Sequence, residues 1–347
     1  MLRVRVIGLG AEHLKERKLR LGIIGLGKMG ILHASLLNVF PEVELVAFCD
    51  KSSLMNRLFK RVFSPTGIHI VDDLEKLHGL DLDAVYVTTP IYSHSFIIKD
   101  LYAKEIARNI FVEKTLASNY NQSKELCEIA KNVGGITMVG YMKRFSVVFG
   151  KAKELLSQGG LGEPQRFKAY AFSSDFLGLT KESKSSASRG GALSDLGCHV
   201  IDLALWMFGR LEVRDVLSIV RSEAGSETSV SFTAVNSSGL VGQFDVSQSM
   251  PCYRMPEFGL SIECSKGKIE VNDDRLCLTL DNGIQRKWYR HDLNDGVHFS
   301  IDDPEYFREN LQFVNSLLSN RQCELSFDNA SIVDYVIDHV RSRSSRQ

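Results

Sequence analysis

The sequence predicts an α/β chain in which a doubly wound parallel sheet is followed by a second domain of the α+β class. In the first 140 residues, short apolar runs alternate with helical patterns, which is typical of a parallel sheet with helices on both faces. Beyond about residue 145, apolar runs follow one another with only Gly, Asn or Ser between them, which favours a mainly antiparallel sheet. A length of 347 residues also exceeds what one hydrophobic core usually organises. We therefore expect domains at residues 1–140 and 141–347.

The elements of the first domain follow from apolar runs and their breaks. Residues 19–25 (LRLGIIG) form a buried strand that stops at a glycine, residues 31–40 form a helix that ends at Pro41, and residues 43–49 form a second strand. The same alternation predicts three more strands and two more helices, namely strands at 84–88, 109–112 and 136–139 and helices at 95–107 and 121–132. Residues 1–18 are interpreted as an extension, because VRVIGLG at 4–10 repeats only part of the following glycine pattern.

The second domain shows strands with few helical patterns between them. Strands are predicted at residues 166–173, 216–220, 229–235, 240–246, 260–264 and 275–280. Two helices, at 304–318 and 329–343, close the chain and can pack back on either domain. The serine-rich stretch 181–191 is a loop just before a helix with candidate catalytic residues, and we expect it to act as a lid.

The composition narrows the class of partner. Lys plus Arg equals Asp plus Glu at 42 each, so no overall field favours nucleic acid or an anionic membrane. The seven cysteines are scattered without metal or redox spacing, which indicates reduced thiols in the cytoplasm and no metal site. No apolar run suits a signal peptide or a membrane span. We therefore expect a small-molecule partner.

A glycine-rich loop, GLGKMG at residues 25–30, lies between the first strand and the first helix. Gly25 permits a tight turn, Gly27 lets the backbone approach a pyrophosphate, and Gly30 allows close helix packing. Asp50 lies twenty residues later at the end of the second strand, where a carboxylate can accept hydrogen bonds from a ribose. The loop and this acid predict a dinucleotide site that includes Gly25, Gly27, Lys28, Met29, Gly30 and Asp50.

The choice of nucleotide is read from Asp50 and the residues after it. The charge of Asp50 would repel the 2′-phosphate of NADP, so we expect NAD. Lys51, Ser52, Ser53 and Arg57 are close enough in sequence to bind that phosphate if the carboxylate turns away, so NADP stays open.

Polar residues also follow two later strands, at the sheet edge where open α/β sheets bind ligands. Lys114 can donate to a substrate oxygen and can have a lowered pKa through burial, although a surface lysine paired with Glu113 is the alternative. A histidine such as His94 is more often structural when it stands alone. The expected cofactor contacts in these segments are Thr88, Thr89, Pro90, His94 and Glu113.

A third element is the glycine turn and helix at residues 190–206. Asp195 and His199 are four residues apart, so an α-helix places them on one face, and Asp202 continues that face. The spacing also suits a metal, but a third ligand is not apparent in the sequence. General acid/base chemistry is therefore the preferred interpretation.

Taken together, these segments resemble the glucose-fructose oxidoreductase, inositol dehydrogenase and rhizopine catabolism family, Gfo/Idh/MocA. The resemblance is carried by GLGKMG with Asp50, by TTPIYSH, by GYMKRF at 140–145 and above all by GGALSDLGCHVIDLALWMFG. It covers nearly the whole chain from residue 19. It implies a Rossmann domain followed by a domain with an open-faced antiparallel sheet, through which such proteins form homodimers or homotetramers.

The same resemblance implies an activity and the residues that perform it. The family oxidises, reversibly, a secondary alcohol of a sugar, a cyclitol or a nucleotide-linked sugar with NAD(P). By position, Lys114 matches the active-site lysine that polarises the reacting oxygen, His199 the proton acceptor, and Asp195 the acid that orients substrate or imidazole. Tyr141 and Arg144 are expected to line the substrate cleft.

One departure from the family pattern concerns Thr115, which stands where a proline usually follows the lysine. Because a cis bond before a non-proline residue costs about 2.5–4 kcal/mol, we expect a trans Lys114–Thr115 peptide. Two alternative functions remain open at this point: a reductase of nucleotide-linked keto-sugars, and a sensor or scaffold that binds the dinucleotide without turnover.

Overall fold

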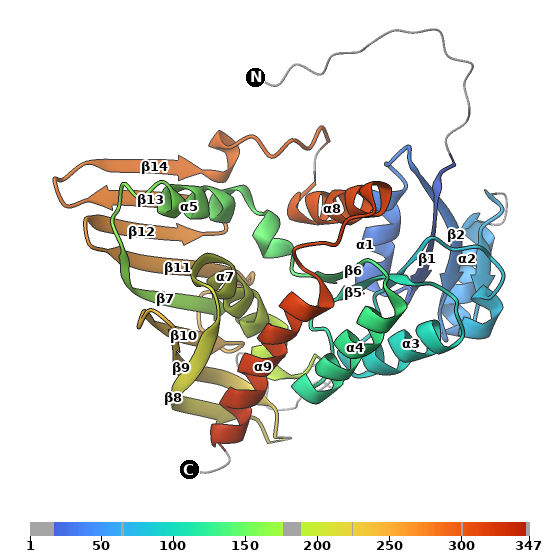
Figure 1. The fold of residues 1–347 in the computed structure, drawn as a ribbon, viewed down its shortest axis with the longest axis horizontal. Coiled ribbons are helices and arrows are strands. Elements are labelled where there is room, and N and C mark those ends of the chain that lie inside the picture. The colour runs from blue at the N-terminus through green and yellow to red at the C-terminus, as the bar shows by residue number, and fades with distance from the viewer. Residues whose placement is uncertain (1–16, 64–65, 176–188, 224, 300, 345–347) are drawn as a thin grey trace, which may run out of the picture.

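The computed structural model describes residues 17–63, 66–175, 189–223, 225–299 and 301–344. It shows two sheets side by side, each with its own helices (Figure 1). The predicted extension at 1–18 lies almost entirely outside the described residues, and so do residues 181–188 of the predicted lid.

The first sheet is six-stranded and wholly parallel, in the order β3-β2-β1-β4-β5-β6. Its strands are β1 (Leu19–Ile24), β2 (Val43–Cys49), β3 (His69–Val71), β4 (Ala84–Val87), β5 (Asn109–Glu113) and β6 (Thr137–Gly140). Strands β4 and β6 are buried at every position, and β1 and β5 are buried after their first one or two residues, as the continuous apolar runs predict. This is the doubly wound order of a Rossmann domain, and that part of the prediction is confirmed.

The helices between these strands begin and end at recognisable signals. They are α1 (Lys28–Leu37), α2 (Ser53–Phe63), the short 3₁₀ helix η2 (Leu74–Leu77), α3 (Ile91–Ala103) and α4 (Tyr120–Val133). In α4, the side chain of Asn119 accepts a hydrogen bond from the backbone N–H of Gln122, and Gly134 ends the helix in the left-handed region at φ 74°.

The second sheet has eight strands in the order β14-β13-β12-β11-β7-β10-β9-β8. They are β7 (Pro164–Phe172), β8 (Leu211–Arg221), β9 (Glu227–Asn236), β10 (Val241–Ser247), β11 (Glu257–Cys264), β12 (Gly267–Asn272), β13 (Arg275–Leu280) and β14 (Gln285–Tyr289). Every neighbouring pair is antiparallel except β7 and β10, which run parallel, so the sheet is mixed and mainly antiparallel.

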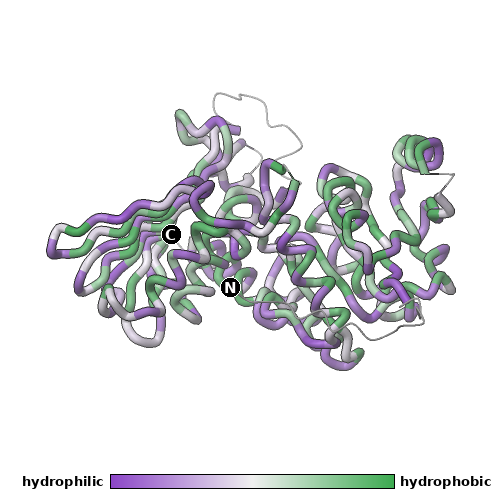
Figure 2. The backbone as a smooth tube through the Cα atoms, turned by 90° about the horizontal axis from the view of Figure 1, so that it is seen from above, coloured by the Kyte–Doolittle hydropathy of each residue, from purple (hydrophilic) through white to green (hydrophobic). Residues whose placement is uncertain are grey.

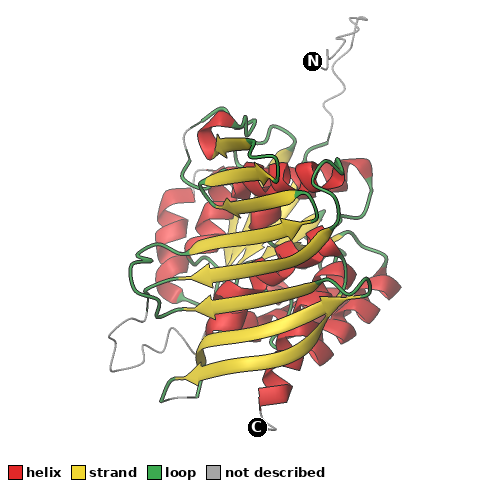
Figure 3. Cartoon of the chain, turned by 90° about the vertical axis from the view of Figure 1, so that its left-hand side faces the viewer, coloured by secondary structure: helices red, strands yellow, loops and turns green. Residues whose placement is uncertain are grey.

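One face of this sheet packs against helices and the other carries none (Figure 3). The helices on the covered face include α5 (Val147–Ser157) and α7 (Cys198–Phe208), which contact β12, β13, β7 and β11. Hydrophilic and hydrophobic residues alternate along the strands (Figure 2). Phe232 and Phe244 stack at 4.6 Å between ring centroids within the buried layer, so the apolar face is a true core and the open face is polar.

The last two helices, α8 (Glu305–Ser319) and α9 (Phe327–Ser344), pack back on the first sheet's helices. Phe307 of α8 stacks on Phe40 at 4.9 Å, and Asp334 of α9 accepts a hydrogen bond from Ser123 of α4 at 2.5 Å. The chain crosses between the sheets at the 3₁₀ helix η3 (Met142–Phe145), directly after β6. The domain division at residues 140 and 141 stays a prediction.

Candidate functional site

The glycine loop lies between β1 and α1, as predicted, and its three glycines meet three different surroundings. Gly25 has φ +96°, a conformation that L side chains rarely adopt. A Cβ on Gly30 would lie 1.9 Å from the carbonyl oxygen of Gly25, so helix and loop pack in direct contact. A Cβ on Gly27 would meet no atom within 4 Å. The loop therefore leaves open space beside Gly27 and none beside Gly30.

The first turn of α1 begins at this open position. Gly27 is the N-cap residue, and no side chain caps the helix. Backbone N–H groups at an uncapped helix N-terminus attract phosphate, both by hydrogen bonding and through the helix dipole. These residues therefore fit the pyrophosphate of a dinucleotide.

Asp50 follows β2 and lies against the glycine loop. Its Oδ2 accepts a hydrogen bond of 2.6 Å from the backbone N–H of Leu26, and its Oδ1 accepts one of 2.7 Å from that of Ser52. The buried Asn56 donates to the Asp50 carbonyl oxygen at 2.7 Å. Each carboxylate oxygen still has lone-pair capacity for a ribose hydroxyl.

The segment after β4 is tied to the glycine loop from the other side. Thr88 donates through Oγ1 to the carbonyl oxygen of Gly25 at 2.7 Å, and Thr89 accepts a hydrogen bond from Ser93 at 2.8 Å. Pro90 is the N-cap residue of α3. Thr88 thus holds the glycine loop, Thr89 and Pro90 lie at the start of α3, and the contact of all three with a cofactor stays a prediction.

His94 is fully buried and connects two strand-end loops. Its Nε2 lies 2.8 Å from the carbonyl oxygen of Thr89, and its Nδ1 lies 2.9 Å from that of Thr115. Burial lowers the pKa of His94, so the ring is neutral and donates to one of these carbonyls at a time. Both ring nitrogens of His94 thus lie against backbone carbonyl oxygens, and its predicted contact with a cofactor stays a prediction.

The expectation of a trans peptide before Thr115 is wrong, because the Lys114–Thr115 bond is cis. The surrounding contacts explain how this geometry is held. Thr115 is only 1% exposed, its hydroxyl donates to the carbonyl oxygen of Ala117 at 3.1 Å, and its own carbonyl oxygen lies beside the His94 ring. The residues around Thr115, and not proline chemistry, therefore define the turn.

Glu113 ends β5 and points into a buried polar group. Its Oε1 lies 2.8 Å from Nε2 of His33, whose Nδ1 lies 3.0 Å from Oδ1 of Asn310 on α8. Nearby Glu309 is fully buried, and neither of its carboxylate oxygens has a hydrogen-bond partner. Burial and the charge of Glu113 raise the pKa of Glu309 well above its usual range. Glu113 thus joins β5 to α1 and α8, and its predicted cofactor contact stays a prediction.

Lys114 crosses from the first sheet to the helix at residues 190–206. Its Nζ donates to the backbone carbonyl oxygen of Asp195 at 2.7 Å and lies 3.5 Å from Oδ1 of the same residue. Burial alone lowers the pKa of Lys114, but Cys198, Asp195 and Glu113 outweigh it and raise the pKa above its ordinary value. The lowered pKa that the sequence suggests is therefore wrong in direction. Lys114 stays charged and acts as a donor.

Asp195 gathers further donors that the motif does not contain. Its Oδ2 accepts a hydrogen bond of 2.8 Å from Gln248, which follows β10, and one of 3.3 Å from Arg189. Gln248 is fully buried, and its Oε1 has no hydrogen-bond partner. The sequence analysis missed both residues because each is identified only by its place next to Asp195.

His199 follows Asp195 by one turn, but the turn between them is a π-helix at Leu193–Gly197. A π turn is wider than an α turn, so the two side chains contact different partners. The His199 ring packs edge-on against Phe258 at 5.0 Å and against Tyr141 at 6.4 Å. Its Nδ1 is buried and has no hydrogen-bond partner.

The charge state of His199 follows from its surroundings. Burial, with the positive charges of Lys114 and Lys143, lowers the pKa of His199 well below its usual range. Lys143 is another residue missed from the sequence. It is buried, forms an ion pair of 2.6 Å with Asp273 and lies over the Phe258 ring. His199 is therefore neutral, the form in which one ring nitrogen keeps a lone pair that can accept a hydrogen bond.

Tyr141 and Arg144, the two residues expected at the substrate cleft, both contact other residues of the protein. Arg144 donates two hydrogen bonds to the buried carboxylate of Asp202, from Nε at 2.8 Å and from Nη2 at 2.7 Å. Tyr141 is fully buried beside His199, and burial raises the pKa of its hydroxyl well above its usual range. Their direct contact with substrate stays a prediction.

No group of three possible metal ligands occurs among the residues that the structure describes. Among those residues there is also no helix long and apolar enough to cross a membrane. What the site does contain is an uncapped helix N-terminus beside an acid, and a charged lysine between the two domains near an acid and a neutral histidine. Together with the doubly wound sheet, these features fit a bound dinucleotide next to a group of acid/base residues.

Comparisons with known proteins identify the family. Residues 19–141 match the oxidoreductase family with an NAD-binding Rossmann fold, and residues 149–270 match the Gfo/Idh/MocA C-terminal domain. The chain belongs to the Gfo/Idh/MocA family, so the resemblance found in the sequence is confirmed.

The similar proteins include two inositol dehydrogenases. The chain is 31% identical over 202 residues to scyllo-inositol 2-dehydrogenase (NAD(+)) of Bacillus subtilis, which covers 56% of the chain and 55% of that protein. It is 26% identical over 289 residues to myo-inositol 2-dehydrogenase of Thermotoga maritima, with 78% and 81% covered. The first of these matches thus spans about half the length of the relative.

A solved structure with the same fold is that of a variant 3-ketoreductase from Actinomadura kijaniata in complex with TDP-benzene and NADP. The TM-score is 0.78 at 18% identity, with 94% of this chain and 98% of that chain covered. At this identity the likeness establishes the fold alone.

Proposed function

We propose that the protein transfers a hydride between a nicotinamide and the alcohol or ketone carbon of a sugar, a cyclitol or a sugar derivative. The observation that carries this proposal is the contact between Lys114 and Asp195, with neutral His199 one turn further along the same helical segment. A charged donor next to a neutral base is what oxidation of a secondary alcohol requires. The two inositol dehydrogenases among the similar proteins support the substrate class.

Each residue then has a separate task. In the oxidative direction, a nitrogen of the neutral His199 ring accepts the proton of the substrate hydroxyl. The Nζ of Lys114 donates a hydrogen bond to the same oxygen and stabilises the negative charge that develops there. Asp195, held by Gln248, positions Lys114 and can accept from a neighbouring substrate hydroxyl. When bound, the nicotinamide supplies the hydride acceptor.

NAD is the proposed physiological cofactor. Asp50 holds its carboxylate against the glycine loop, where it would meet the 2′-phosphate of NADP with a like charge. The hydroxyl and basic residues after it, from Lys51 to Arg57, leave some NADP binding in place. The proposed enzyme therefore binds NAD more tightly than NADP but does not exclude NADP.

The test is a substrate screen. Wild-type protein with NAD⁺ or NADP⁺ is mixed with cyclitols, free sugars and nucleotide-linked sugars, and formation of reduced nicotinamide is followed by absorbance. Keto-sugars with NADH or NADPH cover the reverse direction. We expect turnover with a cyclitol or sugar, and the Lys114→Ala variant is the control for turnover by a contaminating enzyme. Tight NADH binding without turnover on any compound would favour the sensor or scaffold alternative, and turnover confined to nucleotide-linked keto-sugars would favour the reductase.

The proposal also includes the assembly and location of the enzyme. The helix-free face of the second sheet, which is polar along its strands, is proposed as the contact of a homodimer or homotetramer in the cytoplasm (Figure 3). Light scattering coupled to size-exclusion chromatography tests the assembly, and a monomer at micromolar concentration would contradict it.

A further inference from the structure

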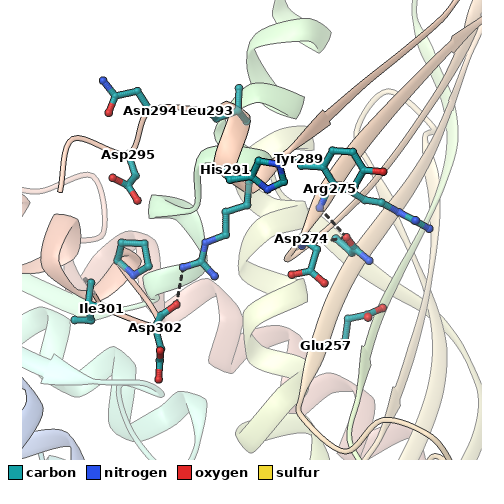
Figure 4. A pocket seen from close by; sticks show the side chains of 13 residues that line it. Glu257, Asp274, Arg275, Tyr289, His291, Leu293, Asn294, Asp295, Ile301 and Asp302 are labelled. Carbon is teal, nitrogen blue, oxygen red and sulfur yellow. Dashed lines mark hydrogen bonds between the residues drawn. The ribbon is translucent and has the colours of Figure 1, made fainter. Parts of the chain in front are cut away.

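A cavity of about 920 Å³ lies at one end of the second sheet, and none of the predicted site residues lines it. Its wall comes from the ends of β11, β12, β13 and β14 and from the segment between β14 and α8 (Figure 4). The volume falls in the range of about 300–1,000 Å³ that is typical of ligand pockets. Nothing in the proposed hydride transfer uses this cavity.

The sheet wall of the cavity lies on the helix-free side, at the strand ends next to the segment that leads to α8, so the proposed oligomer contact has to leave this end of the sheet uncovered. Along β11, β12 and β13, buried residues such as Phe258, Val271 and Leu276 point to the covered face. Side chains next to them in sequence point the opposite way, because alternate residues of a strand face opposite sides. The lining residues Glu257 and Arg275 are two of these neighbours. The sheet thus provides one rigid wall.

The opposite wall is held in place by hydrogen bonds of its own. Arg290 donates to the carbonyl oxygen of Asp302 at 2.8 Å and to the buried carboxylate of Glu305 at 3.2 Å. Arg308 donates to the carbonyl oxygen of Asp295 at 3.1 Å. These bonds tie Arg290 and Asp295 to the first residues of α8 and to Asp302 just before it, so a ligand would pay less ordering entropy on binding here.

The lining is polar and carries both signs of charge. It includes four carboxylates and two guanidinium groups, and the rings of Tyr289 and His291 stack with their centroids 5.4 Å apart. Figure 4 shows Asp274 and Asp295 directed toward the space between the two walls. The charged lining residues are Glu257, Asp274, Asp295, Asp302, Arg275 and Arg290.

This chemistry selects one class of ligand. Hydroxyl groups both donate and accept, so they match a wall of carboxylates, guanidinium groups and amides. An aromatic ring offers the apolar surface on which the carbon–hydrogen face of a sugar ring packs. An anionic ligand such as a sugar phosphate would meet an excess of negative charge, and an apolar ligand would leave the polar groups unpaired.

We propose that this cavity is a second binding site, separate from the catalytic centre, for a neutral or amino-bearing saccharide. A single layer divides it from that centre. Phe258 packs on His199 while its neighbour Glu257 lines the cavity, and the Lys143–Asp273 ion pair lies in the same layer. A saccharide bound here would lie next to the catalytic end of the sheet without touching the reacting groups.

The test measures binding and not turnover, so its failure is distinct from failure of the proposed function. Maltose is titrated against the full-length protein and followed by saturation-transfer-difference NMR, with glucosamine and glucose 6-phosphate as further probes. We expect maltose or glucosamine to bind with a Kd of about 1 mM and glucose 6-phosphate to bind at least about tenfold more weakly. Asp274→Ala and Tyr289→Ala should each weaken binding by about fivefold or more.

Matched controls locate the bound sugar. Asp281→Ala removes the same charge from an exposed turn of the same sheet outside the cavity, and it should leave maltose binding unchanged. Thermal unfolding of every variant shows that it is folded. The proposal is overturned if no neutral or amino-bearing sugar binds, if glucose 6-phosphate binds most tightly, or if His199→Ala abolishes maltose binding while Asp274→Ala and Tyr289→Ala do not.

Discussion

Replacing Gly27 with alanine separates the binding role of the glycine loop from its structural role. A Cβ at this position would meet no protein atom within 4 Å, and the backbone at φ −73° and ψ −168° is open to any L residue. If a pyrophosphate approaches the start of α1 here, the added methyl group occupies its path. The Gly27→Ala variant should therefore fold normally and bind NADH poorly.

The expected magnitudes follow from the same geometry. Alanine is worse than glycine at an N-cap by about 0.5–1 kcal/mol, while the loss of unfolded-state freedom returns about 0.4–1 kcal/mol. The net change in the free energy of unfolding is then below about 1 kcal/mol, which corresponds to a Tm shift of no more than about 4 °C. NADH affinity should fall by at least about tenfold, or 1.4 kcal/mol.

The assay is a fluorescence titration with NADH alongside thermal unfolding. Gly160→Ala is the matched control, since its added Cβ also meets nothing within 4 Å but lies far from the loop in sequence. Gly30→Ala is the opposite case, because its Cβ would collide with the Gly25 carbonyl oxygen and lower the Tm. If Gly27→Ala bound NADH as tightly as wild type at an unchanged Tm, the reasoning about pyrophosphate approach would be refuted.

Four further predictions concern the site and its surroundings. Lys114→Ala and His199→Ala should each lower kcat by at least about a hundredfold with little change in NADH affinity and with non-additive effects, as steady-state kinetics and titration can show. Asp50→Ser should weaken NADH binding and strengthen NADPH binding, and tighter binding of NADPH by the wild type would contradict the ribose contact. Gln248→Leu should lower kcat/KM by about tenfold, because Asp195 loses a buried donor, and an unchanged value would make Gln248 merely structural. Glu309→Gln should raise the Tm at pH 8 but not at pH 4.5. Burial raises the pKa of Glu309, so the stability that its protonated form contributes is complete below the unfolded pKa and is lost as the pH rises from there through the raised folded pKa; equal Tm differences at both pH values would exclude this titration.

The parallel sheet could be predicted from the sequence because its strands are buried on both faces and therefore read as continuous apolar runs. The helix α2 was not predicted from the sequence. Its residues Leu54, Leu58 and Val62 recur at helical spacing but are at least half exposed, while Asn56 and Phe59 are the buried ones. The apolar pattern thus marks the wrong face, and the pattern in the sequence does not indicate a packed helix.

The second sheet was predicted less completely, for a reason that also depends on burial. The edge strand β14 has the sequence QRKWY and is exposed at every position except Trp288. An edge strand with one neighbour needs no apolar alternation, and charged residues there protect it from pairing with other chains. Its place in the sheet comes from hydrogen bonding to β13, which sequence periodicity does not report.

In the candidate site, too, residues within a local motif could be predicted from the sequence, and residues brought in from elsewhere in the chain could not. Lys114, Asp195 and His199 lie in recognisable local patterns, but the residues that fix them come from far along the chain. Gln248 reaches Asp195 across 53 positions. No spacing rule joins two such residues, because their approach depends on how the π turn at Leu193–Gly197 packs against β10 and not on the period of any one element.

The turn at Gly190 and Gly191, directly before the helical segment with Asp195, is also held by a residue near the end of the chain. Arg341 of α9 donates to the carbonyl oxygen of Gly190 at 2.6 Å, to Ser194 at 3.0 Å and to the buried carboxylate of Glu227. Gly191, at φ +78°, has no room for a side chain, since a Cβ would lie 2.6 Å from that carboxylate. The turn that begins the motif is therefore clamped between α9 and β9. Because α9 also packs on α4 of the first domain, the last helix connects the nucleotide-binding half to the turn that places Asp195 beside Lys114.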